Sequence, residues 1–431
     1  MMDYAQTLQH LYEQLPMFSR IGAAAYKKDL HNTYALCEAL GNPQEKIKTI
    51  HIAGTNGKGS TSHMLAAILQ QAGYKTGLYT SPHIKDFGER IRINGEMISE
   101  QFVVDFVAQT QDLCETIKPS FFEVTVAMAL AYFAEQEVDI AVIETGLGGR
   151  LDSTNIIQPL VSVITNIGYD HTNLLGNTLE EIAGQKAGII KENSTAIIGE
   201  ATACTLPVFI KEANEKEAKL VVVPAQFTVE YLESQPGLLL CNIRNNKTGI
   251  VEKLRCDLSG LYQSKNLATV LAVVEELQRQ QFRISETALH RALENVQQLT
   301  GLRGRWEHIG QKPAVIIDVA HNAAGMAQVI LQLALDYPHS RPHFVIGFVK
   351  DKDIKSVLQL MPANAAYYFT NAHSPRALPH AVLKEMAKEF LLEGEGFDDV
   401  NLALSAAKSN ALENDVIIIC GSFFIAAEIN N

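Results

Sequence analysis

The sequence predicts an α/β protein with two domains: a doubly wound sheet that carries a small antiparallel β-patch, and a smaller C-terminal α/β domain. Three observations support this fold class. Strand-like apolar runs alternate with helical ones, the 431 residues exceed the usual size of one hydrophobic core, and the alternation restarts after the segment Gly-Leu-Arg-Gly-Arg at 301–305. We therefore place the domains at 1–300 and 301–431.

The first domain begins with helical periodicity at 4–15 and 27–40, and strands and helices then alternate. Expected strands are 47–53, 75–80, 138–144, 160–165, 195–199 and 219–223, and expected helices are 61–72, 99–117, 122–136, 178–188 and 205–218. This order predicts parallel strands with crossover helices. Short alternating stretches at 227–231, 238–243 and 250–256 predict the antiparallel patch, and the expected helices 264–281 and 285–298 follow them.

The second domain repeats the alternation on a smaller scale and is expected to be Rossmann-like. Its expected strands are 313–318, 342–347, 366–370 and 415–420, and its expected helices are 324–335, 353–360, 379–390 and 401–412. Ligands of open α/β sheets bind outside the C-terminal ends of the strands. We therefore expect the site at such ends, in a cleft between the domains.

Composition excludes several classes of protein. The formal net charge of −12 argues against a nucleic-acid partner, because affinity for nucleic acid comes mostly from Lys and Arg. No apolar run approaches the length of a membrane span, and the N-terminus lacks the regions of a signal peptide. The six cysteines include no Cys-x-x-Cys pair, so neither a zinc site nor a disulfide framework is indicated. We expect a cytoplasmic protein.

A glycine-rich turn with one lysine follows the strand 47–53. Residues 54–60 read Gly-Thr-Asn-Gly-Lys-Gly-Ser and lead into the next expected helix. Backbone N–H groups at such a turn and at a helix N-terminus point toward an anion, and Lys58 adds a positive charge. The loop is a shortened form of the general P-loop, because only two residues separate its first two glycines and a third glycine follows the lysine. The motif predicts phosphate binding and a first domain of the P-loop ATPase type.

Polar side chains follow three other strands of the first domain. Glu144 ends one strand beside a glycine-rich turn, where it is either a magnesium ligand or a cap of the turn. His171 follows another strand end and is either structural or a ligand at a mixed metal site. Ser81, held before a proline, could supply the hydroxyl ligand that the general P-loop takes from its own Ser/Thr.

Two further regions carry candidate functional groups with more than one interpretation. Lys186, among small residues on an expected helix, is either a salt-bridge partner or a desolvated, reactive amine. Asp318 and His321 lie where an apolar strand of the second domain ends. Arg303 and Arg305, on the segment between the domains, are either solvated charges or arms that bind phosphate or a carboxylate.

These motifs, in this order, resemble the folylpolyglutamate synthase family, including its bifunctional dihydrofolate synthase form, within the Mur ligase superfamily. The resemblance runs from about residue 18 to residue 428, and the Lys-Gly-Ser ending of the loop favours the folate branch. The motifs are His-Ile-Ala-Gly-Thr-Asn-Gly-Lys-Gly-Ser at 51–60, Thr-Ser-Pro-His at 80–83, Phe-Phe-Glu at 121–123, Glu-Thr-Gly-Leu-Gly-Gly-Arg-Leu-Asp-Ser-Thr-Asn at 144–155, Asp-His at 170–171, Gly-Arg at 304–305 and Asp-Val-Ala-His-Asn at 318–322.

The resemblance implies an enzyme that uses ATP and magnesium, with two ions expected. It assigns the nucleotide to Gly54, Thr55, Asn56, Gly57, Lys58, Gly59, Ser60, Asn266, Arg305 and Asp318. It assigns magnesium to Ser81, Glu144 and His171. Lys186 matches a lysine that is carbamylated in this superfamily, and the resulting carboxylate would serve the second ion.

The resemblance also implies the substrates: dihydropteroate, reduced folates and L-glutamate. The pterin would contact Phe122, Glu123, Leu151, Asp152 and Ser153. The implied reaction activates a carboxylate as an acyl phosphate, which the amine of glutamate then attacks. The expected catalytic residues are Lys58, Lys186 and His321, with His321 near the incoming glutamate. We expect a monomer that binds neither nucleic acid nor membrane.

One segment departs from the family pattern. The family often has a Gly-Leu-x-Arg type sequence near the N-terminus that contacts the pteroate. Here residues 21–28 read Ile-Gly-Ala-Ala-Ala-Tyr-Lys-Lys, which keeps the glycine but not the arginine. The choice of pteroate substrate is therefore open.

Two other functions compete with the folate ligase as interpretations of these motifs. A Mur-like ligase that joins an amino acid to another carboxylate would share nearly every motif, but the segment Phe-Phe-Glu at 121–123 favours folate. A nucleotide switch protein would need an Asn-Lys-x-Asp segment to read guanine, and the run Asn-Asn-Lys-Thr-Gly at 245–249 does not match it.

Overall fold

The computed structural model describes residues 2–22, 27 and 29–430. The chain folds into two compact units. Unit 1 comprises Met1–Glu230, Cys241–Arg255 and Ser264–Leu302, and unit 2 comprises Tyr231–Leu240, Cys256–Gln263 and Arg303–Asn431. Two short segments that precede residue 300 thus belong to unit 2. The functional domains at 1–300 and 301–431 stay a prediction.

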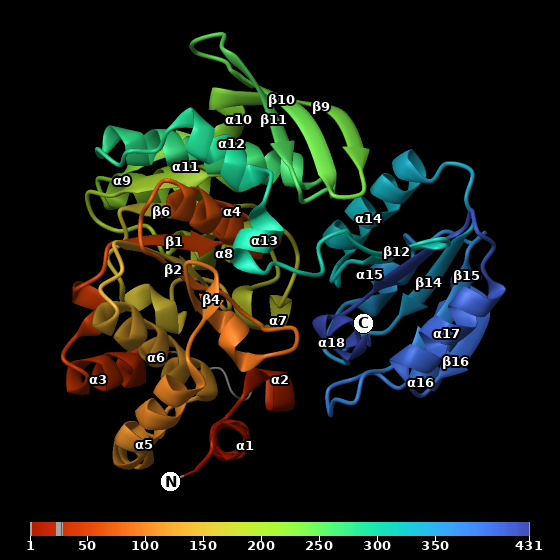
Figure 1. Cartoon of the computed structure of the whole chain (residues 1–431), viewed down its shortest axis with the longest axis horizontal. Coiled ribbons are helices and arrows are strands. Elements are labelled where there is room, and N and C mark those ends of the chain that lie inside the picture. The colour runs from red at the N-terminus through yellow and green to blue at the C-terminus, as the bar shows by residue number, and fades with distance from the viewer. Residues whose placement is uncertain (1, 23–26, 28, 431) are drawn as a thin grey trace. The chain divides into compact units, whose positions relative to one another are not determined.

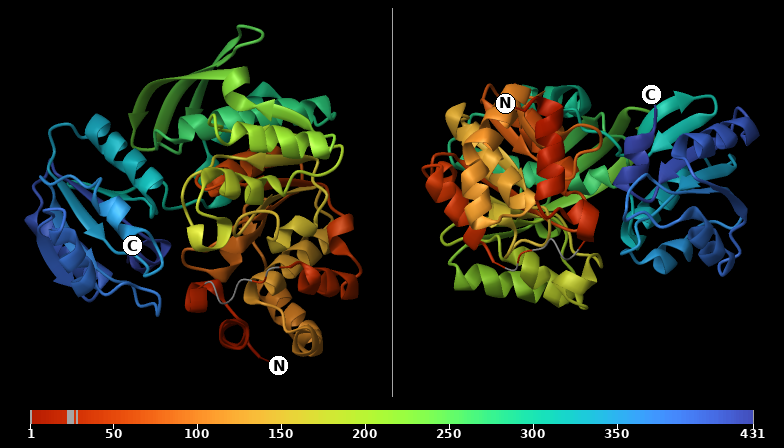
Figure 2. Two further views of the ribbon diagram at one scale, coloured as in Figure 1. Left: turned by 180° about the vertical axis from the view of Figure 1, so that it is seen from behind. Right: turned by 90° about the horizontal axis from the view of Figure 1, so that it is seen from below.

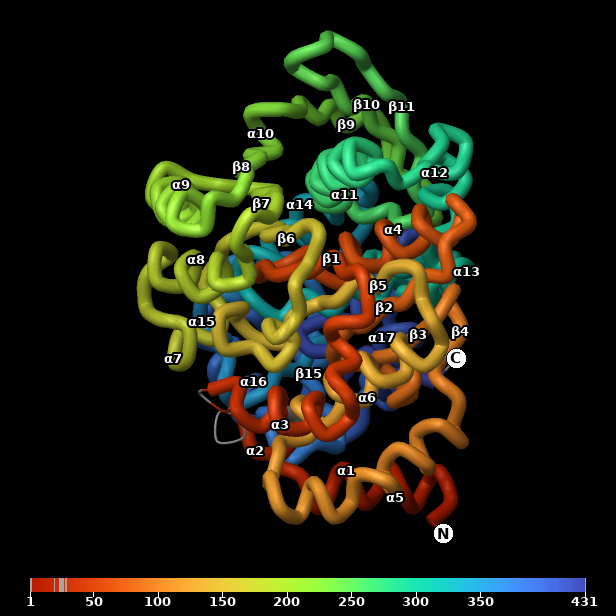
Figure 3. The backbone as a smooth tube through the Cα atoms, turned by 90° about the vertical axis from the view of Figure 1, so that its left-hand side faces the viewer, coloured from red at the N-terminus to blue at the C-terminus, as the bar shows by residue number. Residues whose placement is uncertain are grey.

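The large sheet of unit 1 is mostly parallel, as predicted. Its strand order is β4-β3-β2-β5-β1-β6-β7-β8, and Figure 3 shows its inner strands side by side. The bounds are β1 Thr49–Ala53, β2 Thr76–Tyr79, β3 Ile91–Ile93, β4 Glu96–Met97, β5 Ile140–Glu144, β6 Val161–Ile164, β7 Thr195–Ile198 and β8 Lys219–Val222. All six predicted strands form. The antiparallel hairpin β3–β4 was missed, although its turn, Asn94-Gly95, has positive φ at both residues, as two-residue hairpin turns require.

Helices cover both faces of this sheet (Figure 1). The helices of this part of the chain are α1 Tyr4–Gln14, α2 Phe18–Ile21, α3 His31–Ala39, α4 Lys58–Gln71, α5 Glu100–Ile117, α6 Phe121–Glu135, α7 Thr172–Leu175, α8 Leu179–Ala187, α9 Leu206–Glu215, α10 Val223–Gln226, α11 Gln263–Arg279, α12 Glu286–Leu293 and α13 Val296–Thr300, and some of them pack on other helices rather than on the sheet. On one face, α6 packs closely because Gly77 of β2 has no side chain to keep Phe133 away. Among the described residues, no helix is both long enough and apolar enough to span a bilayer.

Two helix predictions need correction. Helix α4 begins at Lys58 rather than at residue 61, because Gly57 with φ +84° already acts as its N-cap residue. The last turn of the phosphate loop is therefore the first turn of the helix. The expected helix 285–298 is two helices, α12 and α13, because Asn295 leaves helical geometry between them.

The antiparallel patch forms a three-stranded sheet with the order β11-β10-β9. Its strands are β9 Phe227–Gln235, β10 Leu238–Asn245 and β11 Val251–Cys256, and their residues are divided between the two units. Each strand of the patch forms where the alternating pattern predicted it.

Unit 2 contains a second sheet with the order β12-β13-β17-β14-β15-β16. Its strands are β12 Glu307–Gln311, β13 Ala314–Ile317, β14 Pro342–Ile346, β15 Ala366–Thr370, β16 Gly394–Phe397 and β17 Val416–Cys420. The edge strands β12 and β16 were not predicted, because neither carries a clear apolar run. β12 pairs antiparallel to β13, and the other pairings are parallel.

Two apolar clusters bury the two faces of this second sheet. Alternate residues of β14 point to opposite faces, so Phe344 joins one cluster and Val345 the other. Figure 2 shows the helices on both sides of the sheet. They are α14 Ala323–Asp336, α15 Ile354–Leu358, α16 His380–Lys388, α17 Val400–Asn410 and α18 Phe423–Glu428. The sheet is therefore covered on both faces, as expected for a Rossmann-like domain.

Candidate functional site

The predicted strand-end site lies on four neighbouring strands of unit 1. β2, β5, β1 and β6 are adjacent in that order and parallel, so their C-terminal ends lie along one edge of the sheet. The phosphate loop follows β1, Ser81 follows β2, and Glu144 is the last residue of β5. The sheet topology thus gathers these predicted residues at one edge.

Two glycines of the phosphate loop are required by close packing. Gly54 and Gly57 have φ of +152° and +84°, which L side chains rarely adopt. A Cβ on Gly54 would lie 1.8 Å from Thr165 Oγ1, and a Cβ on Gly57 would lie 2.4 Å from Asn266 Oδ1. Asn266, predicted as a nucleotide-binding residue, therefore lies directly against the loop.

Hydrogen bonds hold the phosphate loop against the segment that follows β6. Asn166 binds it twice, because its carbonyl oxygen accepts from Thr55 N at 3.0 Å and its Oδ1 accepts from Asn56 N at 3.0 Å. Thr165 Oγ1 donates to Asn56 O at 2.6 Å. The loop is thus fixed in shape before any anion binds, with the N-terminus of α4 at its end.

Alanine at Gly57 is expected to abolish nucleotide binding and to destabilise the protein by roughly 1–3 kcal/mol, because it adds φ strain and a clash with Asn266. Isothermal titration with ADP and a thermal melt would measure both effects. Gly73→Ala is the matched control, since Gly73 ends the same helix with φ +93° and open space around it. Normal ADP affinity in Gly57→Ala would contradict the assignment.

Two lysines converge on one backbone oxygen of this loop. Lys58 Nζ donates to Gly54 O at 3.2 Å, and Lys186 Nζ donates to the same oxygen at 2.9 Å. Burial, with a contribution from the Lys58 ammonium, lowers the pKa of Lys186 to about 7. Lys186 is thus buried and desolvated, and its reactivity stays a prediction.

The three predicted metal ligands have different surroundings. Glu144 is 4 % exposed, and its Oε2 accepts from Ser81 N at 3.3 Å, so these two residues are brought together. His171 precedes α7, where its ring packs edge-on against Phe18 at 5.7 Å and its backbone N–H donates to Asp170 Oδ1. A hydroxyl, a carboxylate and an imidazole are a donor set that fits a divalent cation. The role of all three as ligands stays a prediction.

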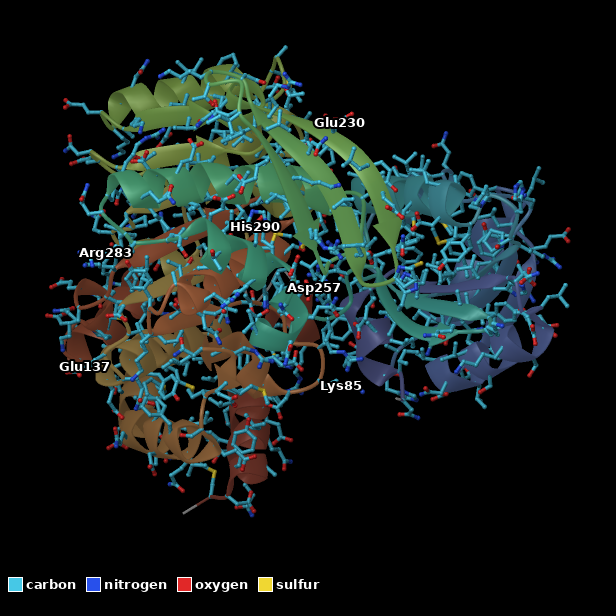
Figure 4. All side chains as sticks on the ribbon, turned by 45° about the horizontal axis from the view of Figure 1, so that its top comes forward. Lys85, Glu137, Glu230, Asp257, Arg283 and His290 are labelled. Atoms are coloured by element: carbon cyan, nitrogen blue, oxygen red, sulfur yellow. The ribbon has the colours of Figure 1, made fainter. Side chains whose placement is uncertain are left out.

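A separate group of potential metal ligands lies away from the strand ends. Glu252 of β11 and Glu286 and His290 of α12 place their ligand atoms within 4.8 Å of one another. His290 is labelled in Figure 4. Glu286 is largely exposed, and His290 already pairs with both carboxylates, at 3.3 and 3.9 Å. Surface ion pairing explains this group without a metal ion.

Three of the predicted pterin residues lie around the loop that follows β5. Phe122 packs on Gly146, where an added Cβ would lie 2.4 Å from the ring. Asp152 is buried at the other end of this loop, and its Oδ2 accepts from Leu147 N at 2.7 Å. Ser153 begins the short helix that Asp152 caps. Phe122 and Asp152 thus contact adjacent residues of the same short loop, Gly146 and Leu147.

The carboxylate of Glu123 has a structural role. Its Oε2 accepts from Ser120 N at 2.6 Å and completes the capping box of α6. Asn32 Nδ2 donates to the same oxygen at 3.4 Å. Leu151 lies in the turn before Asp152 and is partly buried. The predicted departure at 21–28 falls mainly on residues 23–26 and 28, which lie outside the described residues.

In unit 2, Asp318 is a buried acceptor for three donors. Its Oδ2 accepts from Tyr262 OH at 2.7 Å and from Trp306 N at 3.0 Å, and its Oδ1 accepts from Ala320 N at 2.9 Å. Burial raises the pKa of Asp318, and the Tyr262 hydroxyl and the Arg305 guanidinium oppose this shift. The carboxylate therefore organises the start of unit 2.

The other predicted residues of unit 2 lie near the ring of Phe423. The Arg305 guanidinium stacks 5.2 Å from the centre of this ring, and the His321 imidazole lies 5.9 Å from it. His321 Nδ1 is 2.9 Å from Val319 O, which fixes the ring orientation. Arg303 Nε donates to Glu307 at 3.0 Å, so this arginine is a salt-bridge partner rather than a freely solvated charge.

Sequence reasoning assigned no role to four residues that contact predicted site residues, two in each unit. Thr165 and Asn166 directly follow β6, so the strand-end rule that selected Glu144 could have found them. Tyr262 and Phe423 could not be found, because isolated aromatic residues are usually part of a core.

Comparisons with known proteins identify the family. The family model described as the Mur ligase middle domain matches residues 52–274, and that of the Mur ligase glutamate ligase domain matches residues 304–423. A curated relative, dihydrofolate synthase/folylpolyglutamate synthase of Bacillus subtilis, is 33% identical over 413 residues, which is 94% of each chain.

Two solved structures extend the comparison. FolC of Escherichia coli in complex with DHPP and ADP is 30% identical, with a TM-score of 0.86 over 99% of this chain and 96% of that one. The bifunctional enzyme of Yersinia pestis with AMPPNP and a manganese ion is 29% identical, with a TM-score of 0.83 over 99% and 97%. The fold class and the family resemblance are both confirmed: the chain belongs to the dihydrofolate synthase/folylpolyglutamate synthase family of Mur ligases.

Proposed function

We propose that this ATP-dependent carbon–nitrogen ligase adds L-glutamate to dihydropteroate, giving dihydrofolate, and to tetrahydrofolate or its polyglutamates. The observation that carries the proposal is that Lys58 and Lys186 both donate to the Gly54 carbonyl oxygen. The loop that follows β5, on which Phe122 packs and to which Asp152 is hydrogen-bonded, begins at the same edge of the sheet. The E. coli homologue that holds DHPP and ADP supports the same pairing of a folate precursor with a nucleotide.

The chemistry begins with transfer of the γ-phosphoryl group to the carboxylate of the acceptor. The loop N–H groups and Lys58 stabilise the charge on the transferring group, which is where most of the catalysis of such a step resides. Ser81, Glu144 and His171 would hold a magnesium ion, which supplies further neutralisation of phosphate charge. The amine of glutamate then attacks the acyl phosphate, and phosphate leaves.

Lys186 is proposed to react with carbon dioxide. A neutral amine attacks the carbon of CO2 and loses a proton, so the side chain becomes a carbamate with one negative charge. The lowered pKa, about 7, makes the neutral amine abundant at physiological pH. The carbamate would be a ligand for a second divalent ion near the phosphate loop.

Glutamate is assigned to unit 2, where the family model of the glutamate ligase domain matches. His321, with its ring held by the Val319 carbonyl, is the proposed neighbour of the incoming amino acid. The imidazole could accept a proton from the attacking amine, which must be neutral to react. We further propose a cytoplasmic monomer whose ligands are small molecules, with no nucleic-acid or membrane partner.

Phosphate release by the purified protein with ATP, magnesium and L-glutamate tests this function. We expect release with dihydropteroate and, separately, with tetrahydrofolate, and the products should gain one glutamate each by mass. Activity on tetrahydrofolate alone would restrict the enzyme to tail extension. Release with neither acceptor would refute the folate assignment and favour a Mur-like ligase for another carboxylate.

A further inference from the structure

A buried hydrogen-bonded chain leads from the middle of the sheet to Asp152. His51 lies in β1, is fully buried, and places its Nε2 2.8 Å from Thr154 Oγ1. The Thr154 hydroxyl in turn bonds to Asp152 Oδ1. None of the phosphate, metal or substrate assignments above uses His51 or Thr154.

The donors in this chain can be placed by elimination. Thr154 Oγ1 donates to Asp152 Oδ1, so the single hydroxyl proton of Thr154 goes to Asp152. His51 Nε2 must then carry the proton that Thr154 accepts, which fixes the tautomer. Burial and the Lys191 ammonium lower the pKa of His51 to about 3, so its ring is neutral. Among the described residues, no group hydrogen-bonds to His51 Nδ1, which suits a bare acceptor nitrogen better than an N–H.

The chain adds to the donors that surround the Asp152 carboxylate. Thr154 N donates to Oδ1 at 3.0 Å, and Leu147 N donates to Oδ2 at 2.7 Å. Burial raises the pKa of Asp152, and these hydrogen bonds, with one from the Gly146 backbone, oppose the shift. The titratable groups that face this chain are Tyr79 and Lys186 beside Asp152 and Lys191 beside His51.

We propose that His51 and Thr154 are positioning residues for the folate acceptor: through the Thr154 hydroxyl they orient Asp152 at the base of the loop on which Phe122 packs and favour its carboxylate form. An oriented carboxylate can accept hydrogen bonds from ring and exocyclic N–H groups of a pteridine. The proposal rests on the proposed function, in which Asp152 contacts the pterin.

Removal of the hydroxyl tests the proposal. Thr154→Val keeps the shape of the side chain and removes one donor from the carboxylate. We expect kcat/KM for dihydropteroate to fall roughly tenfold, with KM for ATP unchanged. A carboxylate with one donor fewer is harder to ionise, so the acidic limb of the kcat/KM profile should move to higher pH by about one unit. Thr154→Ser restores the donor and should recover most of the loss.

A second pair of variants tests the other end of the chain. His51→Gln places an amide donor near the position of Nε2, whereas His51→Leu removes it. We expect the acidic limb of the kcat/KM profile of His51→Leu to move to higher pH, as in Thr154→Val, and that of His51→Gln to move less. Direct binding of dihydropteroate, measured by fluorescence, should follow the same order.

Thr110→Val is the matched control, because Thr110 is equally buried and its hydroxyl donates to Phe106 O at 2.8 Å within α5. Thr110→Val should lower the melting temperature and leave the pH profile of kcat/KM for dihydropteroate unchanged. If Thr154→Val lowers only the melting temperature, or lowers every kinetic constant together, the positioning role is refuted. If the wild-type protein neither binds nor uses dihydropteroate, the proposed function itself fails.

Discussion

Lys58→Ala is expected to lower kcat by roughly 10³-fold while the protein keeps its fold. The lysine lies in the first turn of α4, and its ammonium is held at the Gly54 and Thr55 carbonyls, within the loop that is to cradle phosphate. The variant loses the positive charge that stabilises the transferring phosphoryl group. Phosphate release in steady state, with circular dichroism to verify folding, is the measurement.

Lys211→Ala is the control for this experiment. Lys211 lies on α9 with a 77% exposed side chain and a helical partner in Glu215. Surface pairs of this kind contribute little, so we expect unchanged turnover. A Lys58→Ala enzyme with near wild-type activity would refute the phosphate-loop assignment, because no other interpretation of the loop requires this charge.

Lys186→Ala is the second change with a large expected effect, a loss of roughly 10²–10³-fold in kcat. The deletion removes both the amine at the Gly54 carbonyl and the carbamate that we propose forms on it. Acetate or propionate should restore part of the activity, because a small carboxylate can enter the space left by the side chain. The measurement is the initial rate with increasing concentrations of either salt, with chloride as the control.

The wild-type enzyme offers an independent test of the same residue. The neutral amine of Lys186 becomes abundant as pH rises through about 7, so at a fixed concentration of dissolved CO2 activation should be slow below that pH and faster above it. Native mass spectrometry of the wild-type protein should detect the added mass of one CO2, and this added mass should be absent from the Lys186→Ala variant. An unmodified wild-type protein with full activity in CO2-free buffer would contradict the carbamate.

The sequence predicted the central strands of both sheets well, for a physical reason. β5 and β17 are buried along their whole length, and each carries a continuous apolar run; β1 is buried throughout as well, although it includes Thr49 and His51. The edge strands β12 and β16 were not predicted, because an edge strand needs no apolar run to form its hydrogen bonds. The start of helix α4 was predicted three residues too late. Glycine has a low helix propensity, so the glycines at the N-cap and in the first turn favoured the prediction of a loop.

The sequence predicted which groups gather at the sheet edge where they directly follow a strand. Glu144 and Lys58 lie there as expected, because the topology places strand ends side by side, and their roles stay predictions. For Glu123 the motif did not reveal a second, structural role, since the residue also closes a capping box at the N3 position of α6; its contact with the pterin stays a prediction. His51 could not be identified as part of the Asp152 chain, because its partner Thr154 is distant in sequence and the contact depends on the fold.

The interleaving of the two units has a consequence for how such enzymes can be recombined. A fragment that begins at residue 301 would lack Tyr262, whose hydroxyl donates to Asp318, and would also lack the parts of β9 and β10 that belong to unit 2. A single crossover between two relatives at residue 301 would therefore separate residues that contact one another within unit 2. Exchange of residues 301–431 between relatives should succeed only when the segments 231–240 and 256–263 are exchanged with them.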